Sequence, residues 1–191
     1  MVVMQALNLE NAVILDTETT GLDSGARICE ISIIDALSGD VLYSNLVSPL
    51  RSIPDVAQKI HGISDSLVAD EPSFDVVWNE IKSILFGKKV IAYNFDFDYR
   101  MVAQSLSDFD YPLQNLSYFL LHDGTNCAMT WYAEFYGQIH DSRTDYRWQS
   151  LTNACKQQGV DVSDLSAHRA LADCEMTRRL IHVVNAKIEA R

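Results

Sequence analysis

The sequence predicts an α/β fold whose central sheet has about five strands, with the elements beginning in the order βββαβα. Three observations indicate this fold. Three strand-like segments follow one another before residue 48, helical spacing starts after Pro54, and a short apolar segment returns near residue 90. The 191 residues contain no repeat or linker. We therefore expect a single domain over residues 1–191, with its core at about 12–187.

The strands are predicted from short apolar runs bounded by turn residues. The first three lie at 12–16, at 28–36, which is rich in isoleucine, and at 41–47, after a Ser-Gly-Asp turn. A fourth apolar run occupies 89–93. We expect a fifth strand near Cys127, within a segment (108–147) that shows no steady period.

Helices are predicted where apolar residues return every three or four positions. Their expected ranges are 55–60, 73–86, 129–136 and 149–157, the last closed by Gly159, with an irregular loop beyond Gly137. A further helix is expected through Tyr99, Val102, Ala103 and Leu106. A final helix begins at about Arg169. Its expected apolar face carries Leu171, Cys174, Leu180, Ile181, Val184 and Ile188.

Composition indicates a globular protein, because 48% of the residues are hydrophobic and Gly and Pro are ordinary in number. No apolar run approaches the roughly 20 residues that span a bilayer, and residues 1–11 lack the pattern of a secretion signal. We therefore expect a cytoplasmic protein without a membrane partner. The four cysteines are far apart and form no Cys-x-x-Cys pair, which predicts reduced, mostly buried thiols.

The net charge of −11 argues against a nucleic-acid ligand. Affinity for a polyanion usually comes from Lys and Arg side chains that release counterions from phosphates. Either the ligand is not a nucleic acid, or binding is local and is assisted by metal ions.

Two carboxylates stand at the end of the first predicted strand. Asp16 and Glu18 are two residues apart, so both side chains point to the same side of the strand. An Asp-x-Glu after an apolar run is a weak signal by itself, because strand ends are often acidic. A solvated strand end and a functional pair are equally compatible with it.

Further candidates lie at two helix starts. Asp98 follows the fourth strand, where Asp98 or Asp96 could instead bind the free amides of a helical turn. Asp173 lies on the apolar side of the last helix, where an unpaired carboxylate is costly unless a cation or hydrogen bonds compensate. His168 precedes that helix, and a lone histidine there is more often a surface residue.

Together these residues resemble three motifs of the DnaQ-like, or DEDDh, exonuclease family over residues 13 to about 185. Asp16-Thr17-Glu18-Thr19-Thr20-Gly21 resembles the first motif, Asn94 with Phe97-Asp98 the second, and His168-x-Ala170-x-x-Asp173 the third. The histidine five residues before the last aspartate indicates the His subgroup. Tyr93 departs from the family pattern, in which histidine is frequent there. The resemblance implies a ribonuclease H-like fold with a mixed sheet.

The resemblance also implies the chemistry of a site with two Mg²⁺ or Mn²⁺ ions, about 4 Å apart in such centres. Asp16 would bridge both ions, Glu18 and Asp173 would complete the site of the attacking water, and Asp98 would support the second ion. His168 would take the proton from that water, a task that suits histidine near neutral pH. Expected substrate contacts are Thr19, Leu22, His61, Asn94 and Phe97.

The function that these residues imply is a metal-dependent 3′→5′ exonuclease. It would release nucleoside 5′-monophosphates from the 3′ end of DNA, with a single strand or a 3′ overhang favoured, and a polymerase or another nuclease is a conceivable protein partner. RNA is the alternative substrate. A catalytically silent binding module is disfavoured because no carboxylate is missing. A calcium-binding protein is disfavoured because the Asp-x-Asp-x-Asp-Gly loop is absent. The sequence leaves the oligomeric state open.

Overall fold

A four-stranded mixed sheet forms the centre of the computed structural model, which describes residues 4–112, 116, 126–140 and 145–190. Its strands are β1 (Ala12–Thr19), β2 (Ile28–Asp35), β3 (Val41–Leu46) and β4 (Lys89–Ile91), in the spatial order β3-β2-β1-β4. The pairs β1–β2 and β2–β3 are antiparallel, and β4 lies parallel to β1. The mixed α/β architecture is therefore as predicted.

The expected fifth strand near Cys127 is a wrong prediction for the described residues. Cys127 forms only an isolated parallel bridge with Ala92. The amide of Ala92 donates to the carbonyl of Asn126, and the amide of Ala128 donates to the carbonyl of Ala92. A helix begins at Ala128, so the chain leaves the extended conformation before a ladder can develop.

The predicted helices all occur, with bounds that shift by a few residues at most. They are α1 (Asp55–His61), α3 (Phe74–Leu85), α4 (Phe95–Ser107), α5 (Ala128–Tyr136), α6 (Leu151–Gln158) and α7 (Ala170–Glu189). The short helix α2 (Asp65–Val68) was not predicted, because four residues are too few to show a helical period. Gly159 ends α6 in the left-handed conformation with φ of 70°, as its position suggested.

The apolar face expected for α7 is correct except at its start. Cys174, Leu180, Ile181 and Val184 are fully buried, and Ile188 packs against the same cluster. Leu171 is 37% exposed, which corrects the prediction. Leu171 lines a surface groove between the start of α7 and residues of β2 and β3, and therefore does not enter the core.

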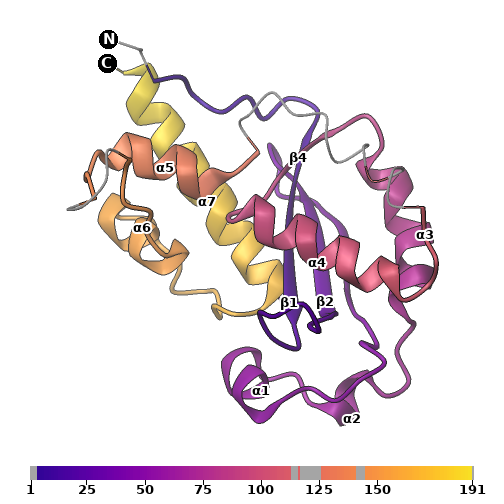
Figure 1. Cartoon of the computed structure of the whole chain (residues 1–191). Helices are drawn as coiled ribbons and strands as arrows, with labels where there is room; N and C mark the ends of the chain where they lie inside the picture. The colour runs from indigo at the N-terminus through magenta and orange to yellow at the C-terminus, as the bar shows by residue number, and fades with distance from the viewer. Residues whose placement is uncertain (1–3, 113–115, 117–125, 141–144, 191) are drawn as a thin grey trace.

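Alternation along β1 sends its side chains into two separate cores. Val13 and Leu15 pack with α3 and α4, whereas Ala12 and Ile14 pack with α5, α6 and α7. The sheet is thus covered on both faces, with the helices of the two layers on opposite sides (Figure 1). The residues that follow Leu15 in β1 continue this alternation, which decides where their polar side chains point.

The helices α1 and α2 lie beyond one end of the sheet, apart from both layers (Figure 1). A small third cluster joins them to the strands; it consists of Cys29, Ile53, Ala57, Ile63 and Val68. The four cysteines are free thiols, and all except Cys127 are buried. Among the described residues, the helices are too short or too polar to cross a lipid bilayer.

Candidate active site

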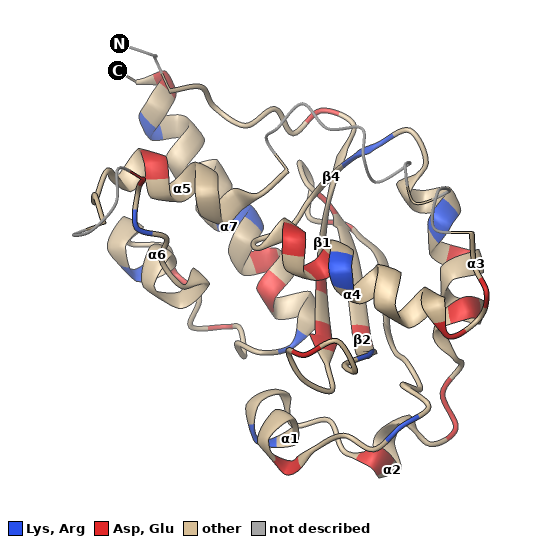
Figure 2. Ribbon diagram, in the orientation of Figure 1, with Lys and Arg blue, Asp and Glu red and all other residues tan. Residues whose placement is uncertain are grey.

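Three carboxylates from opposite ends of the chain meet beside the sheet. Oxygen atoms of Asp16, Glu18 and Asp173 all lie within 4.8 Å of one another. Asp16 and Glu18 follow Ile14 on the face of β1 that α7 covers, and Asp173 lies in the first turn of α7. Figure 2 shows acidic segments of β1, α4 and α7 gathered in the middle of the molecule.

A fourth carboxylate lies near the three converging acids but outside their group, and it comes from the other helical layer. Asp98 lies in the first turn of α4, is only 4% exposed, and accepts a hydrogen bond of 2.8 Å from the hydroxyl of Thr17. Thr17 points away from Asp16 and Glu18, as alternation requires. Asn94, the N-cap residue of α4, makes no side-chain cap bond. The backbone amide of Asp98 is among the groups that lower the pKa of its own carboxyl group, so an interaction with a helix-start amide accompanies its place near the other acids.

The four acids destabilise one another's ionised forms. Burial raises the pKa of Asp16 well above its usual value, and the charges of Asp98 and Asp173 raise it further. Burial, then the charge of Asp173, raises the pKa of Glu18 to about 8. Burial likewise raises the pKa of Asp98 to about 7, although its bond from Thr17 acts in the opposite direction. Burial also raises the pKa of Asp173.

This electrostatic arrangement fits a divalent cation. Crowded carboxylates gain most from a cation between them, because it reverses both the repulsion and the cost of burial. An oxygen-only donor set within 4.8 Å suits Mg²⁺ or Mn²⁺ better than metals that prefer sulfur or nitrogen. The residues present therefore fit the ions that the sequence motifs imply.

His168 lies immediately before α7 and next to the carboxylates. Its side chain is exposed and lines a cleft together with Glu18. Its backbone amide donates to Asp173 over 3.3 Å, and its φ of 64° is in the left-handed region. A non-glycine residue adopts this conformation only when its surroundings hold it there.

The cleft beside Glu18 and His168 has a volume of about 460 Å³. One wall is formed by residues 17–23, and the other by α1 and the residue before it. Leu22, Val56 and Ile60 line it with side chains that are 76%, 72% and 55% exposed. Of the α1 wall only His61 was predicted; Val56 and Ile60 were missed, and their signal was a spacing of four residues on an exposed helix face.

Four of the five predicted substrate contacts line this cleft: Thr19, Leu22, His61 and Phe97. Thr19 is buried and donates to the carbonyl of Gly21 over 2.7 Å, so it supports the loop that carries Leu22. Asn94 is exposed, precedes α4, and is not among the residues that line the cleft.

His61 closes the inner end of α1 and is 5% exposed. Its Nδ1 accepts from the amide of Ile63 over 3.0 Å, and its Nε2 lies 4.0 Å from the thiol of Cys29. Burial lowers the pKa of His61, so the neutral ring is favoured. A neutral, buried imidazole suits packing against a substrate better than binding a phosphate charge.

Comparison with known proteins identifies the family. The sequence matches the RNase_T family model, described as "Exonuclease", over residues 13–181. The chain belongs to this exonuclease family. Its relatives include proteins named DNA polymerase III subunit epsilon, so the expected DnaQ-like membership is confirmed. The acids of the cluster lie in the first strand and the last helix of the region that matches the exonuclease family.

The exonuclease chain has relatives in viruses and bacteria. It is 37% identical over 172 residues to "Uncharacterized exonuclease CP81" of Escherichia phage 186, covering 90% of this chain and 87% of that one. It is 27% identical over 173 residues to the DNA polymerase III subunit epsilon of Pasteurella multocida, covering 86% of this chain and 64% of that one. The exonuclease therefore spans less than two-thirds of that subunit.

Two solved structures share the fold of the exonuclease. Exonuclease X in complex with 5′ overhanging duplex DNA is 29% identical, with a TM-score of 0.64 and 92% of each chain covered. E. coli Exonuclease I in complex with a dA16 oligonucleotide has a TM-score of 0.66 and is 18% identical, covering 93% of this chain and 41% of that one. The second likeness concerns the fold alone.

Proposed function

We propose that this protein is a metal-dependent 3′→5′ exonuclease that releases nucleoside 5′-monophosphates from DNA. The observation that carries the proposal is the convergence of Asp16, Glu18 and Asp173 within 4.8 Å, with Asp98 held beside them by Thr17. A phosphodiester resists attack because its negative charge repels nucleophiles. Two divalent cations, Mg²⁺ or Mn²⁺, would offset that charge and activate the attacking water.

Each side chain has a distinct part in the proposed reaction. Asp16, Glu18 and Asp173 would hold the cations, with Asp98 supporting them from α4, and the bound cations would offset the charge of the scissile phosphate and activate a water molecule. His168 accepts the proton from the attacking water, because its exposed ring lines the same cleft as Glu18. The cleft rim positions the terminal nucleotide through apolar contacts of Leu22 and Phe97, which tolerate any base.

This division of labour accounts for an acidic nuclease. Cations held by the cluster, and not Lys or Arg side chains, neutralise the scissile phosphate, so a net charge of −11 remains compatible with binding a short single-stranded end. The preference for DNA is supported by the likeness to Exonuclease X, whose solved structure is a complex with 5′ overhanging duplex DNA. The polymerase-subunit relatives support a polymerase or another nuclease as a protein partner.

The test is incubation with 5′-labelled single-stranded DNA, duplex DNA with either overhang, and RNA. Each substrate is offered with Mg²⁺, Mn²⁺ or a chelator, for the wild type and two variants. Asp98→Asn removes a buried charge of the cluster, whereas Asp96→Asn changes an exposed acid two residues away. We expect a ladder that shortens from the 3′ end of DNA, requires metal, and is lost in Asp98→Asn only. Faster shortening of RNA would reassign the substrate, and release of 5′-terminal nucleotides would refute the direction.

A further inference from the structure

A second buried glutamate lies directly opposite Glu18. Glu30 of β2 is the cross-strand partner of Glu18 in the β1–β2 register, and its side chain is only 6% exposed. Like charges opposite each other on one sheet face destabilise the pairing, and a buried carboxylate is costly without partners. Glu30 is outside the group of three acids whose oxygens converge, so its presence there needs a separate explanation.

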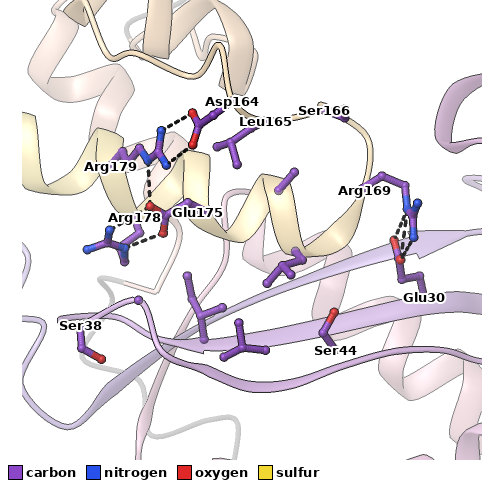
Figure 3. Close-up of a pocket in the computed structure, with 15 residues that line it drawn as sticks. Glu30, Ser38, Ser44, Asp164, Leu165, Ser166, Arg169, Glu175, Arg178 and Arg179 are labelled. Atoms are coloured by element: carbon purple, nitrogen blue, oxygen red, sulfur yellow. Dashed lines mark hydrogen bonds and ion pairs between the residues drawn. The ribbon is translucent and has the colours of Figure 1, made fainter.

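The partners of Glu30 come from the segment that begins α7. The guanidinium of Arg169 approaches both carboxylate oxygens, with Nε at 3.1 Å from each, and the backbone amide of Ala170 donates to Oε2 over 2.9 Å. Figure 3 shows Arg169 reaching from the start of α7 to Glu30 on the strand. A strand side chain therefore binds both the residue before the helix and the first amide of the helix.

This contact fixes the residue next to His168. Arg169 is the N-cap of α7 but gives it no side-chain cap bond, so Glu30 satisfies the amide of Ala170 in its place. On the other side, the amide of His168 is held by Asp173. The backbone of His168 is therefore held by Asp173 at its own amide and by Glu30 at the two residues that follow. The imidazole can move only by rotation about its side-chain bonds.

We propose that Glu30, acting through Arg169 and Ala170, is a positioning residue for His168. The inference rests on the proposed role of His168 as general base. Glu30 pairs with Arg169 and stays outside the group of converging acids, and through the backbone at Arg169 and Ala170 it sets the direction of the His168 imidazole. Displacing a reacting group by about 1 Å lowers the rate of the chemical step much more than it lowers the affinity for the substrate.

The groove of about 570 Å³ in which this pair lies also supplies a control. Farther along α7, Glu175 pairs with Arg178 and Arg179, and Arg179 also pairs with Asp164 (Figure 3). These pairs resemble Glu30–Arg169 in chemistry, but they lie farther along α7 and do not contact the start of the helix. Glu175→Gln therefore removes a paired carboxylate of the same helix without touching the segment of His168.

The test compares Glu30→Gln, Arg169→Gln and Glu175→Gln in steady-state cleavage of single-stranded DNA, with melting curves to establish folding. We expect kcat to fall about 10- to 100-fold in the first two variants with KM nearly unchanged, and to stay at the wild-type value in Glu175→Gln. Arg169→Gln keeps the test valid should Glu30→Gln fold poorly, because the Arg169 side chain is 49% exposed. An equal loss in Glu175→Gln would mean general loosening of α7 and would overturn the proposal.

The decisive arm repeats Glu30→Gln in a His168→Ala background. Without an imidazole to misplace, the added substitution should change the residual rate by no more than about twofold. A loss as large as in the wild-type background would overturn the positioning role. A wild type that shortens no DNA in Mg²⁺ would instead refute the proposed function, whereas an active wild type with an unimpaired Glu30→Gln refutes only this inference.

Discussion

Asp16 and Asp108 are both aspartates of the same small domain, and their surroundings are opposite. Asp108, at the end of α4, accepts two hydrogen bonds of 2.7 Å from Arg27 and one of 2.8 Å from Arg51, and the bond from Arg27 lowers its pKa. Asp16 is half-buried among other acids, and no ion pair reaches it from the described residues. Arginines thus satisfy acids outside the cleft and leave the cluster to bind a cation.

The largest expected difference is between removing an acid of the cluster and removing Asp108. We expect Asp16→Ala and Asp173→Ala to lower the cleavage rate by at least about 1000-fold, since bound metals contribute several kcal/mol to the transition state. Asp108→Ala should retain the wild-type rate. Steady-state release of nucleotides measures this effect. A fold that stays intact in Asp16→Ala is expected, because like-charge repulsion is relieved; a variant that keeps most of its rate would contradict the metal assignment.

His168→Ala separates proton transfer from metal binding within the cluster. We expect the rate to fall about 100- to 10,000-fold, the usual contribution of a general base. Calorimetric titration with Mn²⁺ should give the wild-type affinity, because the imidazole is not one of the converging ligands. The rate profile should also lose the pH dependence that reports the base. An unchanged profile would remove His168 from that role.

Adding metal should stabilise the protein through the acid cluster and not through Asp108, which is already paired with two arginines. At a hundredfold excess over the dissociation constant, binding contributes about 2.7 kcal/mol, or a rise in melting temperature of roughly 5–10 °C for a chain of this size. We expect Mg²⁺ or Mn²⁺ to produce this rise in the wild type and in Asp108→Ala, and chelator to reverse it. Retention of the full rise in Asp16→Ala would place the cation elsewhere.

The two regions should also give pH effects of opposite sign. An acid whose pKa is raised by folding contributes stability at low pH, and that contribution is lost as the pH rises through the folded value. For Glu18 the interval runs from 4.5 to about 8. For Asp108, whose pKa is lowered, the contribution is lost as the pH falls below the usual value of 3.8.

Melting temperatures in chelator between pH 5 and pH 8 test the first of these effects. We expect a decline in the wild type that is smaller in Glu18→Gln, whose amide does not ionise. Equal pH dependence in the two proteins would show that Glu18 titrates normally in the fold.

The smallest expected effect is the loss of the Asp108 ion pairs. Asp108→Asn should lower the free energy of unfolding by about 1 kcal/mol, because partly exposed ion pairs contribute little. Urea denaturation with an unchanged m-value measures it. A loss several times larger would indicate that the buried charge of Arg27 depends on Asp108 and is not satisfied by its bonds to the carbonyls of Ser24 and Ala26.

The parts of the fold that could be predicted from the sequence are those with a strong local period. Alternation in β1 predicts that Asp16 and Glu18 share a side, and the strand-to-helix junction locates Asp98 near the start of α4. That these acids meet Asp173 came from the resemblance of three motifs, since no local pattern relates residues so far apart. The fifth strand and α2 failed because their segments are too short to show a period.

The pairing of Glu30 with Arg169 could not be predicted for a related reason. The two residues are 139 positions apart, and each occurs in an ordinary context, a β-strand and a helix start. Leu171 likewise had the spacing of a core residue, but it faces a groove between α7 and the strands β2 and β3, and helical spacing does not reveal such a groove. Val56 and Ile60 of the cleft wall were missed because exposed apolar side chains on a seven-residue helix also fit a loosely packed surface.

The alternation of β1 makes the length of the strand part of its chemistry. Ile14 packs against α7, and Asp16 and Glu18 lie two and four residues after it on the same face of the strand. Thr17 faces the other way, toward α4. Deleting one residue between Ile14 and Asp16 would leave the apolar half of the strand in place and rotate both acids into the layer of α3 and α4. Such a chain would keep every catalytic side chain and most of its core, yet its carboxylates would face the wrong helix.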